Sequence, residues 1–370
     1  MHKTLKNKRY EHLLSSAIVV LLFYAFLVSI ELISHACKTL DTLYLSQIIE
    51  ATSNPFITLF IGILATAVLQ SSSITTSLAV ALVASEVISI QQALPFVMGA
   101  NIGTTVTCAF VALTHITTRS EYRKAVAAST THGLFNMLTA AVVFPLNYFT
   151  RFLERLSSFF ASVLFPSSFQ DFSEWNITFK LVRPVAYWIV KKFEINRLGE
   201  FIIGIFLLII ILRALTFILK NFLFENQLKT IDKYLFGNKL KSLLSGLLIT
   251  ASLQSSSVTT SFLVPMVATQ KVSLYNGFAF IIGCNIGTTL TALLAAVSKS
   301  DAAVSLAVAH LLFNLIGMLI FFPIKIFYDI PIYLANRIGV LTHKWRITGF
   351  LYLLLVYFII PFLLILLSKI

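Results

Sequence analysis

The sequence predicts an all-α, polytopic membrane protein built as an inverted repeat. Hydrophobic residues make up 58% of the 370 residues and charged residues only 12%, whereas soluble domains carry about a quarter charged residues. Seven apolar stretches are long enough to cross a bilayer, and two more are interrupted by polar clusters of nearly identical sequence. We therefore expect about seven full spans plus two re-entrant helical hairpins, with one hairpin and one broken transmembrane helix in each half.

The first predicted span follows a basic N-terminal segment. It covers residues 13–33, is too long for a removable signal peptide and lacks a small-residue cleavage pattern. The other stretches of spanning length cover residues 93–117, 125–149, 198–219, 274–297, 302–324 and 348–367.

Two further apolar regions, residues 55–84 and 240–269, do not fit as straight spans. The segment QSSSITTS interrupts the first and QSSSVTTS the second, which leaves halves of about 12 to 16 residues. Such halves are too short to cross a hydrocarbon core of about 30 Å. Backbone N–H and C=O groups that lose their helical hydrogen bonds at a turn are tolerated within the bilayer only where the protein surrounds them. Each region is therefore predicted to be a re-entrant hairpin with its polar cluster at the tip.

The distribution of charge predicts the orientation. Lys and Arg total 28 against 15 Asp and Glu, a net charge of +13, and cytoplasmic loops carry such an excess in membrane proteins. A cytoplasmic N-terminus and, after seven spans, an external C-terminus follow. The excess thus indicates a basic cytoplasmic side and a bilayer partner, not nucleic acid. The residues placed on that side are Lys3, Lys6, Lys8, Arg9, Arg119, Arg123, Lys124, Lys220, Lys229, Lys233, Lys239, Lys241, Lys325, Arg337, Lys344 and Arg346.

An internal repeat organises the chain. Residues 70–77 match residues 254–261 at seven of eight positions, and residues 99–105 match residues 283–289 at six of seven, both 184 residues apart. Two His-x-x-Phe-Asn motifs, which begin at His132 and His310, extend the match. One span precedes the first hairpin and four precede the second. Because this difference of three is an odd number, the second copy crosses the membrane in the opposite orientation to the first. Inverted repeats with broken helices are typical of secondary transporters, whose sites lie at the repeat interface.

The repeat divides the chain into six segments. Residues 1–53 hold the N-terminal segment and first span, 54–149 the first repeat, 150–197 an external linker with an interfacial helix, 198–238 a connecting span and cytoplasmic loop, 239–324 the second repeat, and 325–370 an interfacial segment and the last span.

The hairpin tips have the chemistry of an anion site. Helix N-termini with free N–H groups bind anions, and serine hydroxyls add neutral donors. Two such tips facing each other would cradle a compact oxyanion. The expected phosphate-type ligands are Ser71, Ser72, Ser73, Ser255, Ser256 and Ser257.

The partner segments, residues 101–105 and 285–289, have the chemistry of a cation site. Their glycines weaken the helix, so we expect unwound points that offer carbonyl, amide and hydroxyl oxygens to a small alkali ion. Neither segment contains an acidic residue.

Structural alternatives exist for these polar residues. Ser and Thr in membrane helices usually bond to the backbone or to a neighbouring helix, but their paired, inverted occurrence here favours function. For His132 and His310, a structural histidine and a functional one are equally supported. Glu31, Glu86 and Arg213 are expected to snorkel to the interface from span ends. The three cysteines support neither a disulfide framework nor a metal site.

The motifs QSSSITTS, QSSSVTTS, GANIGTTVT and GCNIGTTLTALLAA, with the two HxxFN segments, carry a family resemblance. Over residues 54–145 and 239–323 the sequence resembles the type II sodium-dependent phosphate cotransporters, including their bacterial members. The resemblance implies sodium-driven uptake of inorganic phosphate by alternating access, no enzymatic activity, no cofactor apart from the coupling sodium ions, a homodimer, and a bacterial plasma or inner membrane.

The resemblance also implies which residues bind. Phosphate would be held by the six serines named above. A sodium site in the second repeat would use Gln254, Ser255, Thr288 and Thr291, and one in the first repeat Ser73 and Asn136. Gln70, Thr104, Asn101 and Asn285 complete the expected sodium ligands.

Two positions depart from the family pattern. A threonine that some members contribute to the first-repeat sodium site is Ala109 here. Electrogenic members have Asp directly after the first-repeat histidine, where this chain has Gly133. The resemblance therefore implies that one sodium site is missing and that transport is electroneutral.

Other functions remain open. The same architecture would suit a sodium-coupled transporter of another oxyanion or a small carboxylate. An ion channel is less favoured, because carbonyl filters need oligomeric symmetry and not an inverted repeat. No catalytic residue is expected, since the spans hold no HExxH, paired carboxylates or Ser/His/Asp spacing.

Overall fold

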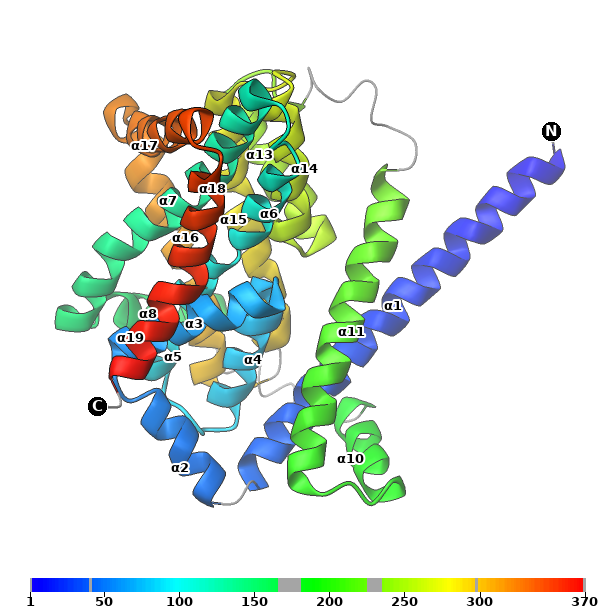
Figure 1. Ribbon diagram of the computed structural model, residues 1–370. Coiled ribbons are helices and arrows are strands. Elements are labelled where there is room, and N and C mark those ends of the chain that lie inside the picture. Colours follow the sequence, from blue (N-terminus) through cyan, green and yellow to red (C-terminus); the bar gives the residue numbers. More distant parts are fainter. Residues whose placement is uncertain (1, 40–41, 166–180, 225–234, 297–298, 369–370) are drawn as a thin grey trace.

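A computed structural model describes residues 2–39, 42–165, 181–224, 235–296 and 299–368, and the regular structure in these ranges is helical (Figure 1). Side chains of residues 2–16, 39, 42–45 and 219–224 are not described. The predicted linker residues 166–180, residue 297 of the fifth predicted span, and the side chains of Lys3, Lys6, Lys8, Arg9, Lys220, Lys229 and Lys233 lie outside the described part.

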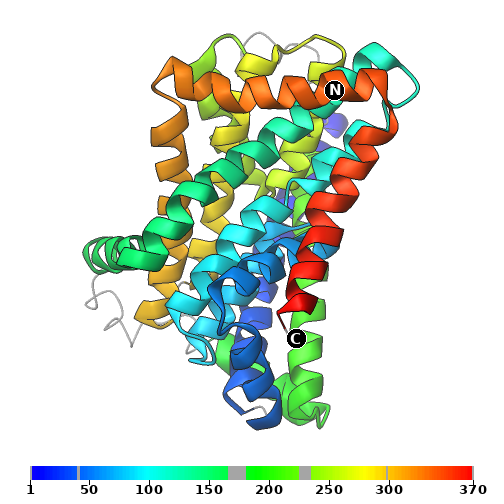
Figure 2. The same cartoon turned by 60° about the vertical axis from the view of Figure 1, so that its left-hand side comes forward.

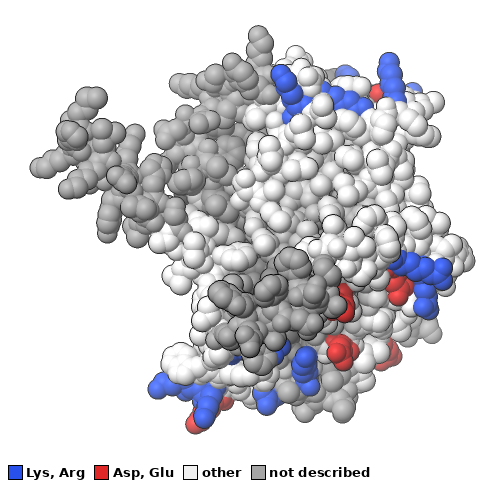
Figure 3. Space-filling view, turned by 180° about the vertical axis from the view of Figure 1, so that it is seen from behind, with Lys and Arg blue, Asp and Glu red and all other residues white. Residues whose placement is uncertain are grey.

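The seven predicted spans are confirmed in the described part of the chain as helices long and apolar enough to cross a membrane. The space-filling view shows charged side chains gathered at two ends, with an uncharged band between them (Figure 3). The spans are Ala17–Lys38, Ile90–Leu113, Arg119–Thr150, Arg197–Ile218, Leu274–Ala296, Asp301–Phe321 and Ile347–Leu367.

Two helices form one flank of the bundle. α1 (His2–Thr39) packs along α11 (Arg197–Phe224), although more than 150 residues separate them in sequence (Figure 1). The short helix α2 (Thr42–Ala51) leads from α1 into the first repeat.

Both predicted hairpins are present as pairs of short helices. The first consists of α3 (Pro55–Leu69) and α4 (Ser72–Ala84), and the second of α13 (Lys239–Leu253) and α14 (Ser256–Ala268). At each tip a glutamine is in the left-handed conformation, with φ of 56° at Gln70 and 53° at Gln254. A serine then caps the next helix, because its hydroxyl accepts a hydrogen bond from the third following backbone N–H. The two turns are thus built the same way.

Glycines explain why each hairpin packs closely on its partner helix. A Cβ atom at Gly99 of α5 (Ile90–Gly103) would lie 2.0 Å from the carbonyl oxygen of Leu59 in α3. In the second repeat a Cβ atom at Gly283 would lie 1.9 Å from the carbonyl oxygen of Leu243. Only a residue without a side chain permits this backbone approach, which is common between membrane helices. The repeat in sequence is therefore a repeat in packing.

The broken helix occurs in the first half only. α5 ends at Gly103 and α6 (Val106–Leu113) begins after a tight turn, in which the Thr105 N–H bonds to the Ile102 carbonyl at 3.2 Å. In the second half α15 (Leu274–Ala296) runs unbroken through residues 285–289, so the predicted break is wrong there. Both motif glycines provide close contact, since a Cβ atom would lie 2.4 Å from the Ile63 carbonyl oxygen at Gly103 and 2.5 Å from the Leu247 carbonyl oxygen at Gly287.

The remaining helices complete the bundle. α7 (Arg119–Thr150) leads into α8 (Phe152–Leu164), and α10 (Arg183–Lys192) precedes α11. α16 (Asp301–Phe321) is followed by α17 (Lys325–Lys344), which lies across one end, crosswise to the spans (Figure 2). The last span consists of α18 (Ile347–Leu354), the π-helical turn η3 (Leu355–Ile359) and α19 (Ile360–Leu367).

Glu31 does not snorkel as predicted. Its carboxylate is buried and accepts hydrogen bonds from Arg183 at 3.0 Å and from Lys299 at 2.5 Å. Desolvation lowers the pKa of the Lys299 amine, and the charge of Glu31 opposes that shift. Glu31 belongs to α1 and Lys299 to the segment between α15 and α16, so this pair ties the flank helices to the second repeat.

Candidate functional site

The two hairpin tips meet and form the candidate site. The Ser73 hydroxyl donates a hydrogen bond to the Gln254 carbonyl oxygen at 2.9 Å, across 181 residues of sequence. The hydroxyls of Thr104 and Ser257 lie 2.9 Å apart and form a second link between the repeats. The structure thus brings the two copies of the QSSS motif together, as their inverted repetition predicts.

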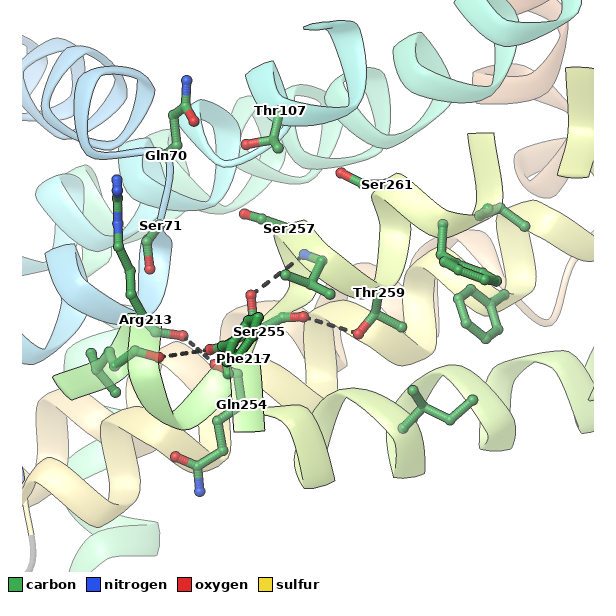
Figure 4. A pocket seen from close by; sticks show the side chains of 18 of the residues that line it. Gln70, Ser71, Thr107, Arg213, Phe217, Gln254, Ser255, Ser257, Thr259 and Ser261 are labelled. Carbon is green, nitrogen blue, oxygen red and sulfur yellow. Dashed lines mark hydrogen bonds between the residues drawn. The ribbon is translucent and has the colours of Figure 1, made fainter. Parts of the chain in front are cut away.

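A cavity of about 790 Å³ lies beside these tips (Figure 4). It continues along α14 and the second half of α11 to Lys271, which follows the far end of α14. Among the described lining residues the charged ones are Arg213 and Lys271, and none is acidic. The polar lining comprises Gln70, Ser71, Ser73, Thr107, Thr216, Gln254, Ser255, Ser257, Thr259 and Ser261.

The six predicted phosphate serines take two different positions. Ser71, Ser73, Ser255 and Ser257 line the cavity. Ser72 and Ser256 begin α4 and α14 and are buried behind the tips, with 3% and 2% of their surface exposed. Their backbone N–H groups belong to helix N-termini, where anions are stabilised. A compact anion at the tips would meet hydroxyls and helix ends from both repeats.

The predicted sodium ligands of the second repeat lie on two elements. Gln254 and Ser255 form the tip, whereas Thr288 and Thr291 are buried in α15. The Thr288 hydroxyl donates to the Cys284 carbonyl oxygen at 2.8 Å. The Thr291 hydroxyl is buried without a hydrogen-bond partner among the described residues, which leaves an oxygen atom available to a cation.

In the first repeat the predicted ligands are already engaged. Ser73 and Thr104 bond to the opposite hairpin, as described above. Asn101 donates its amide to the Val97 carbonyl oxygen at 3.0 Å, and Asn136 donates to the Asn101 carbonyl oxygen. Gln70 is exposed at the cavity edge.

Both motif histidines bond to the opposite repeat. His132 Nε2 lies 2.8 Å from Asn285 Oδ1, and His310 Nε2 lies 3.3 Å from Asn101 Oδ1. The Asn285 amide also donates to Asn136 Oδ1 at 2.5 Å. All five side chains are buried. The histidines therefore position the asparagines across the repeat interface, a contact that the sequence does not reveal.

The family model of the Na+/Pi-cotransporter matches residues 25–165 and 207–328, which include both hairpins. The chain belongs to this family. The resemblance of the motifs is thereby confirmed.

Several curated relatives of the family are similar along most of this chain. The human sodium-dependent phosphate transport protein 2B is 27% identical over 91% of this chain and 63% of its own length. The bovine protein 2B is 28% identical over 93% of this chain and 64% of its own length. The sheep protein 2A is 27% identical over 94% of this chain and 67% of its own length. The chain thus spans less than two thirds of the human relative. No solved structure shows a significant match.

The two departures from the family pattern have a structural basis. Ala109 is buried in α6 and offers no ligand oxygen from its side chain. A Cβ atom at Gly133 would lie 2.7 Å from the Tyr357 hydroxyl oxygen, and that hydroxyl lies 2.6 Å from the Thr105 hydroxyl. The last span therefore fills the space that a larger residue at position 133 would need.

Arg213 lines the cavity although it is not among the predicted site residues. It is expected to snorkel to the interface, and in the structure it is exposed and lines the cavity from α11, five residues before the end of the span Arg197–Ile218. The signal in the sequence is a single arginine within the apolar run LLIIILRALTFIL, in the last third of the span Arg197–Ile218. A charged residue inside a span indicates function unless a partner accounts for it.

Proposed function

We propose that this chain carries out sodium-coupled symport of inorganic phosphate into the cell by alternating access. The observation that carries the proposal is the meeting of the two inverted serine tips, with the Ser73–Gln254 hydrogen bond between them, at the head of one cavity. The relatives named above are sodium-dependent phosphate transport proteins, and the proposal extends that function to this chain.

Phosphate would bind at the tips. Ser71, Ser73, Ser255 and Ser257 would donate hydroxyl hydrogen bonds from the cavity side, and the N-termini of α4 and α14 would add backbone N–H groups. Ser72 and Ser256 begin those helices, and each would give the anion its hydroxyl as well as its backbone N–H. Hydrogen bonds to a charged acceptor are stronger than neutral ones, so a neutral cradle can hold an anion.

Sodium would bind beside the phosphate. Gln254, Ser255, Thr288 and Thr291 offer the oxygen ligands that a hard cation needs, and the unpartnered Thr291 hydroxyl supports this set. In the first repeat, Gln70, Ser73, Thr104, Asn101 and Asn136 would contribute, with Asn285 at the repeat interface. Because several of these groups bond to each other in the structure, we expect them to exchange partners when sodium binds.

The unequal exposure of the two hairpins supports alternating access. The cavity runs along α14 as far as Met266, whereas α4 is buried along almost its whole length. Inverted repeats can exchange such environments between two states. We propose a second state in which α4 lines a cavity on the opposite side and α14 is buried.

The chain would work in a bacterial plasma or inner membrane, with a cytoplasmic N-terminus and an external C-terminus, as a homodimer and without enzymatic activity. These features rest on the family resemblance and on the charge distribution. Sodium would act as the coupling ion.

The test is uptake of labelled phosphate by purified protein in liposomes. We expect uptake that depends on an inward sodium gradient, that stops when choline replaces sodium, and that excess unlabelled phosphate abolishes. Arsenate, sulfate and small carboxylates serve as competitors. Transport of one of these in preference to phosphate would favour the alternative substrate class, and uptake without any sodium dependence would contradict the proposal.

A further inference from the structure

Arg213 is a charged residue within a candidate membrane span. It belongs to the span Arg197–Ile218 of α11 and lines the cavity beside the hairpin tips. No carboxylate in the described part of the chain forms an ion pair with it. A charge at this depth is costly and is retained where it faces water or meets an opposite charge. The cavity provides the water, and an anion bound in the cavity would provide the opposite charge.

The cavity lining favours an anion as that charge. Of its described lining residues, Arg213 and Lys271 are cationic and none is acidic. A cleft with charges of one sign concentrates ligands of the other sign. Lys271 follows the far end of α14, a helix of 13 residues, so it lies about 20 Å from the tips at 1.5 Å per residue. Of the two described cations of the cavity, Arg213 is therefore the one near the serines.

The direction of the side chain agrees with this role. Arg213 extends from α11 toward the first tip, with Gln70 and Ser71 on that side (Figure 4). A guanidinium group presents a planar fork of donors that matches two phosphate oxygens at once. The serines and helix ends supply only neutral donors, so Arg213 would add a positively charged side chain to the sodium ions proposed beside the anion.

We propose that Arg213 binds the transported oxyanion on the cavity side of the serine tips through a charge-assisted, bidentate hydrogen bond. The proposal rests on phosphate being the substrate of this site. It makes α11, which is not part of either hairpin, a contributor to the binding site. It also adds a charged side chain to a phosphate site otherwise composed of hydroxyl and backbone N–H groups.

The test compares charge removal with charge retention. Arg213→Gln and Arg213→Met remove the cation, and neither is expected to unfold the protein, because each takes a charge out of a membrane span. Arg213→Lys keeps the charge but loses the fork. Lys271→Gln is the matched control, since it removes the other cation of the same cavity far from the tips. Equilibrium binding of labelled phosphate to purified protein in saturating sodium, and the KM for phosphate uptake, are measured for each variant.

We expect Arg213→Gln and Arg213→Met to weaken phosphate binding about ten- to a hundredfold, because the loss of a hydrogen bond to a charged group reduces affinity by about that factor. Arg213→Lys should fall between these variants and the wild type, and Lys271→Gln should stay within about twofold of the wild type. Melting temperatures in sodium without phosphate check that the fold is intact.

The outcomes separate this inference from the proposed function. If the wild type binds and transports phosphate and Arg213→Gln matches it in both assays, the role of Arg213 is wrong while the function stands. Equal losses in Arg213→Gln and Lys271→Gln would show that general cavity charge matters and would also overturn the assignment. If the wild type neither binds nor transports phosphate, both proposals fail.

Discussion

His132 and Asn285 are joined across the interface between the two repeats, with Nε2 of the histidine 2.8 Å from Oδ1 of the asparagine. The symmetry-related pair, His310 and Asn101, is longer at 3.3 Å. Buried polar groups of this kind must be satisfied by one another, because no water compensates for a lost partner. The first pair therefore anchors the second repeat's α15 to α7 of the first.

Replacing Asn285 with leucine should destabilise the protein. The change removes the acceptor of His132 and the donor to Asn136, so two buried groups lose their partner. We expect a loss of about 1–3 kcal/mol for each unpaired group, seen as a lower melting temperature in detergent. Asn276→Leu is the matched control, since it removes one hydrogen bond, to the Phe236 carbonyl, at the helix end. Equal melting temperatures for the two variants would contradict the anchoring role.

Replacing Ser72 or Ser256 with alanine should abolish sodium-dependent phosphate uptake and leave the protein in the membrane. The fold should survive, because Thr76 and Thr260 bond to the backbone carbonyls of these serines and not to their hydroxyls. Ser252→Ala is the control, as Ser252 is exposed and its hydroxyl bonds to the Leu248 carbonyl of its own helix. Normal uptake by both tip variants would show that the site is assigned to the wrong residues.

Replacing Gly99 with alanine should destabilise the first repeat. The new Cβ atom would lie 2.0 Å from the Leu59 carbonyl oxygen, and backbone cannot move aside as a side chain can. Overpacking of this kind costs about 1–3 kcal/mol, measured by thermal unfolding. Gly277→Ala is the control, because its Cβ atom would meet only side-chain carbons at 3.4 Å. If the Gly99 variant were as stable as the Gly277 variant, the two helices would be able to move apart without a loss of stability, which would contradict the prediction.

Phosphate transport should carry little net charge. The resemblance implies that the sodium site served by an aspartate in electrogenic members is missing at Gly133. We expect no phosphate-evoked current in reconstituted membranes. Gly133→Asp alone should not produce one, because the Tyr357 hydroxyl lies 2.7 Å from the position of the new Cβ atom. A saturating, sodium-dependent current in the wild type would refute electroneutrality.

The sequence determined the elements and their order. The length of the apolar stretches determined the seven spans, because a helix needs about 20 apolar residues to cross the hydrocarbon core of a bilayer. The doubled QSSS motif placed both hairpin tips at Gln70 and Gln254, since a polar cluster inside an apolar run must turn or find protein partners. These features depend on local sequence alone, and so could be predicted without contacts.

The tertiary structure decided which polar groups meet. Helix α15 stays unbroken whereas α5 ends at Gly103, although their motifs nearly match and Gly103 and Gly287 pack equally closely on carbonyl oxygens of their hairpins. The pairing of His132 with Asn285, the burial of Glu31 and the position of Arg213 on the cavity depend on residues far apart in sequence. A lone charge or amide in a span has the same local sequence whether it faces lipid, a partner or a cavity. Only the packing of the helices distinguishes these environments.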